Sequence, residues 1–421
     1  MSKLAIFGGE PVRTKPFPPW PYHDEREVEA ALEVTRSGKW YRYAGDKVRQ
    51  FEQAFADYHG AKYAQAVTSG TKALEAGLWA LGVGAGDEVL VPSYTFVSTA
   101  TAVVANGATP VFVDIDLETY ALDLQAAEKL ISDRTRAIVP VHFGGCPCNM
   151  EALMAFAARH GLRVLEDAAH AHGGFWDGRG LGSIGDIGAF SFQYSKNITA
   201  GEGGILLTSD QELATRIFSR HSYGQRPGQP WYNHELVSTN LRMTEWQGAI
   251  LLVQLSRLRE QTERRLENAR RLDAALAGFA DLSVVGNKDP RAAMRAYHLY
   301  LFRYTPAEPG LDNRQIARAL SAEGIPCSIG YPIPLYRQPL FRGVTPPTWQ
   351  PERYEALFLP NVERACRETI WLPQNLLLGD EHDTDDIIRA IEKVLANQDE
   401  LRAKGPKEVT LGPGPQRAQI G

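Results

Sequence analysis

Between residues 60 and 210, short apolar runs rich in β-branched residues alternate with stretches of helical periodicity. The strand-like runs are residues 89–91, 111–114, 137–141, 163–167, 189–192 and 204–208, and the helix-like stretches are residues 71–81, 97–106, 123–131, 150–160 and 210–221. Strict alternation of this kind predicts an α/β fold with a mostly parallel, doubly wound sheet. Because ligands of such sheets bind beyond the carboxyl ends of the strands, residues that follow a strand are the first candidates for a site.

The rest of the chain predicts a second, smaller α/β domain. Its expected elements are a long charged helix at residues 245–276, a strand at 297–304, a helix at 313–323 and a terminal helix at 383–397 that Thr384 caps. We therefore expect a large domain at residues 1–255, which includes an extended proline-rich N-terminal segment, and a small domain at residues 256–397. Residues 398–421 carry Gly, Pro and charge without periodicity and predict a loose tail.

Composition excludes several classes of protein. The formal net charge of -5 argues against a nucleic-acid binder, and no stretch of about 18 apolar residues is present to span a membrane. The four cysteines are too few and too irregular for a disulfide framework, and the pair Cys146 and Cys148 lacks further ligands at zinc spacing. The apolar run at the N-terminus is too short for a signal peptide. These features predict a cytoplasmic protein with reduced thiols and no metal.

Two segments at the ends of predicted strands carry a carboxylate and a lysine that could act together. Asp167 ends the strand-like run 163–167 and begins the sequence Asp-Ala-Ala-His, and Lys196 stands shortly before the turn Gly-Glu-Gly-Gly at residues 201–204. A lysine and a carboxylate so placed are the parts needed to hold pyridoxal 5'-phosphate. The amine forms a Schiff base with the aldehyde, and the acid keeps the pyridine nitrogen protonated. Taken singly, Asp167 is equally well explained as a helix N-cap and Lys196 as a solvated turn residue.

A third segment suggests a site for phosphate. Residues 67–71, with the sequence Val-Thr-Ser-Gly-Thr, directly precede a helix-like stretch. Glycine lets an anion approach the backbone, and a helix N-terminus offers unpaired N–H groups, although an ordinary helix cap has the same composition. The chain has no dinucleotide-binding glycine motif after a strand, no Walker sequence, no zinc-protease helix and no Gly-x-Ser-x-Gly elbow.

The order of these segments resembles that of the DegT/DnrJ-type sugar aminotransferases, a branch of the fold-type I pyridoxal phosphate enzymes, over about residues 9–397. The resemblance implies that Lys196 binds the cofactor aldehyde and shuttles the proton, and that Asp167 pairs with the pyridinium nitrogen. It further implies cofactor contacts at five other positions. Phe96 stacks on the ring, His170 hydrogen-bonds near the ring hydroxyl, and Gly70, Thr71 and Ser191 bind the phosphate. By itself, His170 is equally well explained as a packed core histidine.

In this family an asparagine from the neighbouring subunit also reaches the phosphate, and Asn240 stands in its place. The family usually has Gly-Tyr or a similar pair before that segment, whereas this chain has Ser238 and Thr239. The resemblance thus implies a homodimer with shared active sites.

Three short segments, at residues 191–193, 244–247 and 334–336, are most similar to the branch that acts on cyclitols and related rings, which includes the scyllo-inosose aminotransferases and the aminohydroxybenzoate synthases. That likeness implies that Tyr336 and His298 lie near the substrate; a packed turn aromatic and a satisfied strand histidine are the alternatives. The implied reaction is a ping-pong transfer of an amino group from glutamate or glutamine to a keto sugar or keto cyclitol. Two other functions stay open: a same-fold sugar dehydratase, which carries histidine in place of Lys196, and a non-catalytic sugar-binding regulator.

Overall fold

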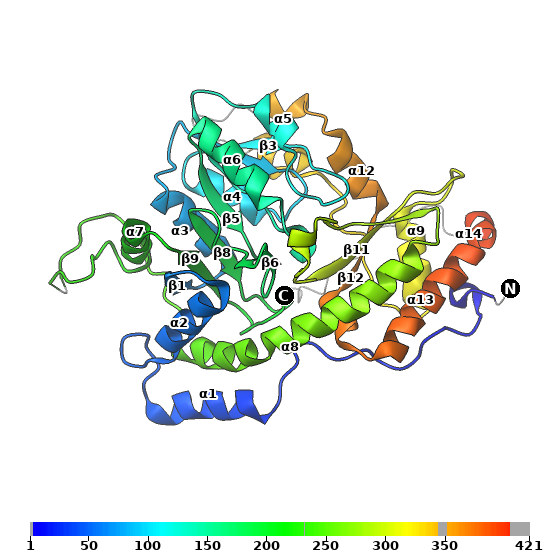
Figure 1. Cartoon of the computed structure of the whole chain (residues 1–421), viewed down its shortest axis with the longest axis horizontal. Coiled ribbons are helices and arrows are strands. Elements are labelled where there is room, and N and C mark those ends of the chain that lie inside the picture. The colour runs from blue at the N-terminus through cyan, green and yellow to red at the C-terminus, as the bar shows by residue number, and fades with distance from the viewer. Residues whose placement is uncertain (1–2, 231, 344–351, 405–421) are drawn as a thin grey trace.

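The computed structural model describes residues 3–230, 232–343 and 352–404, which form a large and a small α/β unit joined by one long helix (Figure 1). The large unit is built on a seven-stranded sheet with the strand order β1-β9-β8-β5-β4-β2-β3. Its strands are β1 (Tyr63–Val67), β2 (Glu88–Pro92), β3 (Thr109–Val113), β4 (Thr135–Ile138), β5 (Arg163–Asp167), β8 (Ile187–Ser191) and β9 (Gly204–Thr208). β9 is antiparallel to both of its neighbours and all other pairs are parallel. The predicted α/β fold with a mostly parallel sheet is therefore confirmed.

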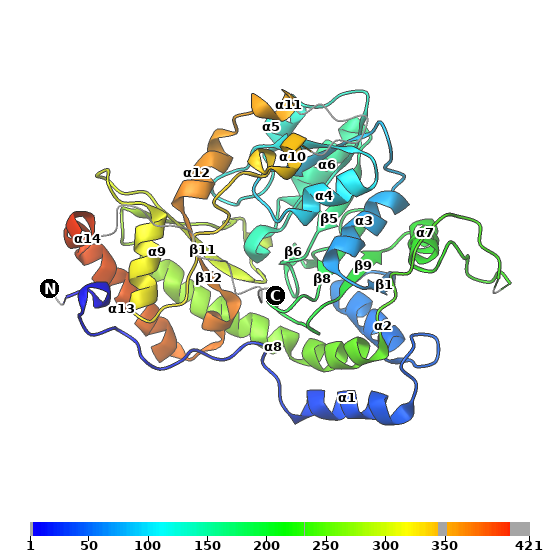
Figure 2. The same ribbon diagram turned by 180° about the vertical axis from the view of Figure 1, so that it is seen from behind.

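Helices cover both faces of this sheet because its strands are apolar on both sides. Leu165 packs with α3 (Gly70–Ala80) and α4 (Ser98–Ala105), whereas Val164 packs with α2 (Lys47–His59) and α6 (Met150–His160). Successive side chains of a strand point to opposite faces, so each strand serves both layers. Figure 1 shows the face with α2 and α6, and Figure 2 the face with α3 and α4. The remaining elements of the large unit are α5 (Leu124–Glu128), α7 (Gln211–His221) and the hairpin of β6 (Phe175–Trp176) and β7 (Arg179–Gly180).

The helix α8 (Glu245–Leu276) has the bounds that the sequence predicts, and it connects the two units. Its first half contributes Leu251 and Leu258 to the large-unit core, and its second half contributes Leu266 and Leu272 to the small-unit core. The small unit has an antiparallel sheet of β10 (Leu282–Val284), β11 (Leu299–Tyr304) and β12 (Thr369–Pro373), with helices α9 (Asn313–Ala322), α13 (Glu381–Ala396) and α14 (Gln398–Lys404). The helices α10 (Leu340–Gly343), α11 (Glu352–Glu355) and α12 (Pro360–Glu368) lie between β11 and β12 in the chain, and their buried side chains pack in the core of the large unit. The expected boundary at residue 255 falls inside α8, and the domain limits stay a prediction.

The structure differs from the sequence expectations at both ends of the chain. The side chain of Asp380, not that of Thr384, caps α13 by accepting a hydrogen bond of 2.9 Å from the Asp383 backbone N–H. The expected loose tail begins as α14, because Leu401 is fully buried in the small-unit core; residues 405–421 lie outside the described residues. The N-terminal segment also packs on the small unit, where Arg13 forms ion pairs of 2.8 Å with Asp383 and Asp386.

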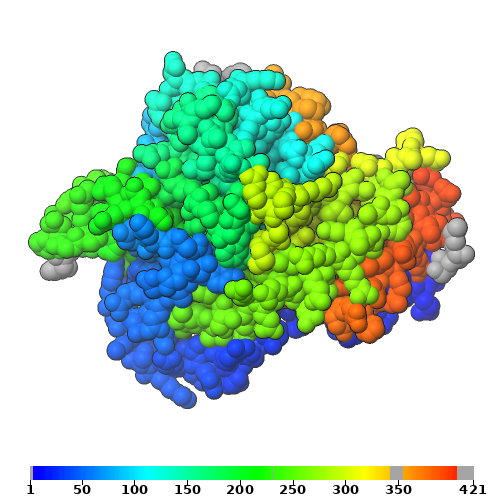
Figure 3. Space-filling model, viewed as in Figure 1, coloured from blue at the N-terminus to red at the C-terminus, as the bar shows by residue number. Residues whose placement is uncertain are grey.

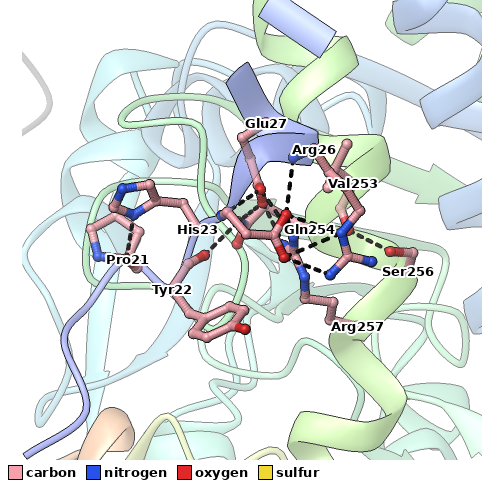
Figure 4. A network of polar contacts seen from close by, with 10 residues as sticks. Pro21, Tyr22, His23, Arg26, Glu27, Val253, Gln254, Ser256 and Arg257 are labelled. Carbon is pink, nitrogen blue, oxygen red and sulfur yellow. Dashed lines mark hydrogen bonds and ion pairs between the residues drawn. The ribbon is translucent and has the colours of Figure 1, made fainter. Parts of the chain in front are cut away.

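A further helix, α1 (Glu25–Ser37), was not expected and is fastened to α8 by a polar network (Figure 4). Arg257 donates to both carboxylate oxygens of Glu27, and its Nη2 atom also lies 2.8 Å from Asp24. Gln254 donates to Glu27 and to the backbone carbonyl of Tyr22, at 2.6 and 2.9 Å. Because Glu27 and Arg257 are both buried, this network fixes α1 against α8 at one register. Among the described helices none is both long and apolar enough to cross a membrane.

Candidate active site

Asp167 ends β5 and lies in the sheet beside the end of β8, with Ala189 opposite it in the register. Its carboxylate is buried, and one oxygen accepts a hydrogen bond of 2.7 Å from the Thr99 hydroxyl of α4. The other oxygen accepts from the backbone N–H of Ala169 at 3.2 Å. Burial raises the pKa of the Asp167 carboxyl, whereas the hydrogen bonds from Thr99 and Ala169 and the charge of Lys196 act to lower it.

Lys196 lies on the turn that follows β8. Its backbone N–H bonds to the carbonyl of Gln193 at 2.9 Å, and Phe192 is tied across the turn to Gly203, whose φ of 150° suits glycine. Burial lowers the pKa of the Lys196 amine to about 8, and the negative charge of Asp167 opposes that shift. Each of the two charges changes the pKa of the other group, which indicates that the amine and the carboxylate lie near each other.

Glu166, which precedes Asp167 in β5, has a structural role. Glu166 is fully buried and accepts hydrogen bonds from the backbone N–H groups of Gly182, Ile184 and Gly185, at 2.6 to 2.8 Å. Nε2 of His142 lies 2.9 Å from the same carboxylate. Because side chains alternate along a strand, Glu166 points away from Asp167 and secures the loop before β8. Of the two adjacent acids, only Asp167 is available for chemistry.

The expected phosphate residues meet at the N-terminus of α3. A Cβ atom on Gly70 would lie only 2.6 Å from Cβ of Ser191, so glycine is needed for the end of β8 to approach the helix. The hydroxyls of Thr71 and Ser98 lie 2.7 Å apart, which adds the first turn of α4 to the same edge. Unpaired N–H groups and the helix dipole make such an edge suitable for an anion.

Two histidines, one from each unit, meet at the site with tilted rings. The rings of His170, which follows β5, and His298, which precedes β11, have centroids 4.2 Å apart and planes inclined by 33°. Both side chains are buried. Burial and the charge of Lys196 lower the pKa of both imidazoles well below the usual value. The site therefore lies where the large and small units meet.

Three other expected site residues form none of these contacts. Phe96 precedes α4, and its side chain is 53% exposed. Asn240 is exposed, and its side-chain oxygen accepts a hydrogen bond of 3.1 Å from the backbone of Arg242 in its own segment. Tyr336 is fully buried and its hydroxyl donates to Glu363, which favours the packed turn aromatic over a substrate contact.

Sequence reasoning missed three residues that contact the site residues. Thr99 bonds to Asp167, Asn197 bonds to His298, and Tyr331 lies close enough to Asp167 for that charge, after burial, to raise the pKa of its hydroxyl. Thr99 lies in an apolar helix and Tyr331 in an irregular loop, so neither carries a pattern that a sequence displays. Asn197 directly follows Lys196, which is the one signal that was available.

These residues fit pyridoxal phosphate. A lysine with a lowered pKa shares one site with a buried carboxylate at a strand end, and a glycine-requiring helix N-terminus lies beside Ser191. In the described part of the chain, no group of three or more His, Cys, Asp or Glu side chains is arranged to hold a metal ion. Fold and site together define a pyridoxal phosphate-dependent aminotransferase of the fold-type I architecture.

The chain belongs to the DegT/DnrJ/EryC1/StrS aminotransferase family, whose model matches residues 21–392. It is 39% identical to an L-glutamine:2-deoxy-scyllo-inosose aminotransferase of Streptomyces paromomycinus, over 93% of this chain and 97% of that protein. It is 37% identical to a 3-amino-5-hydroxybenzoate synthase of Amycolatopsis mediterranei, over 88% of this chain and 96% of that protein. The crystal structure of 3-amino-5-hydroxybenzoic acid synthase is similar, with a TM-score of 0.85, 35% identity and coverage of 91% of this chain and 100% of that one.

Proposed function

We propose that this enzyme moves an amino group from glutamine or glutamate to a keto cyclitol or keto sugar in two half-reactions. The relatives named above support the choice of donor and acceptor, because one uses L-glutamine and 2-deoxy-scyllo-inosose by name and aligns over nearly its whole length. The observation that carries the proposal is the buried Asp167 carboxylate at the end of β5, held by the Thr99 hydroxyl, with Lys196 near enough for the charge of each group to act on the other.

When bound, pyridoxal phosphate supplies an aldehyde for the amine and a ring that withdraws electrons from the reacting carbon. Lys196 is suited to bind that aldehyde, because a pKa of about 8 leaves part of the amine neutral near physiological pH. The same amine, when free, would take the proton from the carbon of the donor. Asp167 holds a proton on the ring nitrogen, and Thr99 orients its carboxylate for that contact.

The proposal assigns the remaining cofactor contacts to the residues predicted from the sequence. Gly70, Thr71 and Ser191, which meet at the N-terminus of α3, would bind the phosphate, and the exposed ring of Phe96 would stack on the cofactor. His170 would hydrogen-bond near the ring hydroxyl. These roles extend the prediction made from the sequence.

We further propose that two copies of the chain share their sites through the arm, which comprises residues 222–230 and 232–242 between α7 and α8. Asn240 is exposed on the arm, and the family resemblance assigns it a phosphate contact in the neighbouring subunit. Several apolar and aromatic side chains of the arm and of the loop before α2 are also exposed to solvent. Those exposed by 40% or more are Trp40, Tyr41, Tyr43, Tyr223, Tyr232, Leu236 and Val237. Exposed groups of this kind are typical of protein interfaces.

The test is a product screen by mass spectrometry. Purified holoenzyme is mixed with keto cyclitols or nucleotide-linked keto sugars and with glutamine, glutamate or alanine labelled with ¹⁵N in the α-amino group. We expect an amine product that carries the label from glutamine or glutamate. A dehydrated product without nitrogen would indicate the dehydratase, and binding without turnover would indicate the regulator; either result refutes the proposal.

A further inference from the structure

Asn197 joins the turn of Lys196 to the strand entry that holds His298. Its side chain is fully buried, and Nδ2 donates a hydrogen bond of 2.7 Å to the backbone carbonyl of Ala296. The amide orientation is thereby set, because only the NH₂ group can donate to a carbonyl. Oδ1 of Asn197 then faces Nδ1 of His298 at 3.3 Å. An amide oxygen only accepts, so Nδ1 of His298 carries the hydrogen.

His170 has the opposite arrangement. Its Nδ1 accepts a hydrogen bond of 3.2 Å from the backbone N–H of Gly144, so this nitrogen carries the lone pair and Nε2 the hydrogen. The turn that aims this N–H contains Gly144 and Gly145 at φ values of 63° and 86°. A Cβ on Gly145 would lie 2.7 Å from the backbone nitrogen of Tyr297 and 2.9 Å from the carbonyl oxygen of His170. Only glycine fits this turn.

The two adjacent rings therefore differ at Nε2, which carries a hydrogen in His170 and a lone pair in His298. Both imidazoles are neutral, since burial and Lys196 disfavour their protonation, and each carries a single N–H hydrogen. Among the described residues, Nε2 of neither ring has a hydrogen-bond partner. Neither of these atoms is fully enclosed, whereas both ring nitrogens of His172 are buried and have no partner. Beside Lys196, His170 thus offers an N–H donor and His298 a lone pair.

We propose that Asn197 holds His298 as the Nδ1–H tautomer, so that Nε2 of His298 accepts a hydrogen bond from a ring hydroxyl of the keto substrate. This inference rests on the proposed function, because a hydroxyl-bearing keto ring supplies the O–H donor. His170 cannot serve the same group as an acceptor, since its Nε2 is protonated. Asn197 is a positioning residue in this scheme and His298 is a contact residue for the acceptor substrate.

The tautomers are tested directly by solid-state NMR of the holoenzyme labelled with ¹⁵N at the histidine ring nitrogens. The spectrum of His298→Asn assigns the signals of residue 298 by their loss. We expect a protonated Nδ1 and a bare Nε2 at His298, and the reverse at His170. Asn197→Asp keeps an acceptor for Nδ1 and should keep this tautomer, whereas Asn197→Ala should release it. A protonated Nε2 at His298 in the wild type overturns the inference.

The hydroxyl contact is tested by two substitutions of His298 in stopped-flow assays of the separate half-reactions. The amide of His298→Gln reaches the position of Nε2, whereas that of His298→Asn reaches only the position of Nδ1. We expect His298→Asn to lower kcat/KM for the keto substrate by about 10-fold or more, as the loss of one hydrogen bond to substrate does, and His298→Gln to recover most of that loss. The half-reaction with the amino donor should change little in either variant.

Two outcomes separate the failure of this inference from that of the proposed function. Equal losses in both variants, or an equal slowing of the donor half-reaction, refute the hydroxyl contact while the wild type still aminates its substrate. A wild-type enzyme that aminates no keto cyclitol or keto sugar refutes the proposed function and the hydroxyl contact together. The NMR measurement distinguishes that case, because the tautomers do not depend on which substrate is used.

Discussion

The interior of the site and the arm are built on different principles. Around Lys196, the side chains of Asp167, Asn197 and His298 are buried and hydrogen-bonded within one chain. The arm projects from the body beside α7, as Figures 1 and 3 show, and Val237 on it is 95% exposed. The backbone of the arm is nevertheless tied to itself, through a bridge between Ser222 and Asn240. The comparison teaches that one chain preorganises the buried chemical groups, whereas the exposed arm is the segment that we propose to contact a second copy.

The largest effect is expected from Lys196→Ala. Removal of the amine eliminates both the covalent attachment of the cofactor and the proton shuttle, so turnover should fall by at least about 10²–10⁴-fold. Steady-state amination assays measure the loss, with Lys129→Ala as the control, because Lys129 is an exposed residue at the end of α5. Turnover at the wild-type rate would show that the site is misassigned.

Asp167→Asn should follow in size. The amide keeps the shape of the carboxylate but cannot pair with a charged ring nitrogen, and we expect kcat to fall by roughly 10²-fold or more. The pKa of Lys196 should also fall below its value of about 8, because the charge of Asp167 favours the ammonium form. The rate of cofactor capture by cofactor-free enzyme rises as the amine loses its proton. In Asp167→Asn, the midpoint of the plot of capture rate against pH should therefore lie at lower pH than in the wild type. A midpoint at higher pH would contradict the shared site.

Asn240→Ala tests the arm, and we expect it to weaken cofactor retention by roughly 10-fold, the effect of losing one hydrogen bond to a charged group. Equilibrium dialysis measures the retention, and sedimentation checks the assembly. The sharper test mixes Asn240→Ala with Lys196→Ala subunits. If Asn240 acts on its partner, each mixed dimer has one intact site, and about a quarter of all sites recover at equal mixing. Without recovery, Asn240 does not act across an interface.

The smallest effect is expected from Thr99→Val, which removes one hydrogen bond to Asp167 at nearly constant volume. That bond lowers the pKa of the carboxyl, so its loss should raise this pKa and reduce the ionised fraction. We expect kcat to fall by about 10-fold, with the acidic limb of the pH–rate profile moved to higher pH. Thr99→Ser keeps the hydroxyl and should retain most of the activity. A profile that shifts to lower pH would oppose this account.

The interior could largely be predicted from the sequence, because its strands are short apolar runs that are buried on both faces. The elements at residues 150–160, 163–167, 204–208 and 245–276 are observed as predicted. Asp167 and Lys196 were recognisable because Asp167 ends such a strand and Lys196 follows one within a few residues. Thr99 was not, because its bond to Asp167 joins residues 68 positions apart and depends on how α4 packs on the sheet.

The periphery was harder to predict for physical reasons. α1 and α2 have apolar stripes among many charged residues, and their burial against α8 is a tertiary contact. In α13, Thr384 and Asp380 are both possible caps in sequence, and only the backbone geometry selects Asp380. Tyr336 resembles a substrate residue by its motif, yet the fold directs its hydroxyl to Glu363. The tautomer of His298 depends on a bond across 101 positions.

The most direct test of the central claim is to fix the cofactor to the protein and find the attachment residue. The purified holoenzyme is reduced with borohydride, digested and analysed by peptide mass spectrometry. The account predicts a phosphopyridoxyl group on the peptide that contains Lys196, in the wild type and in Lys129→Ala alike, and none in Lys196→Ala. A label on another lysine, or an unlabelled wild type that still transfers amino groups, would contradict it.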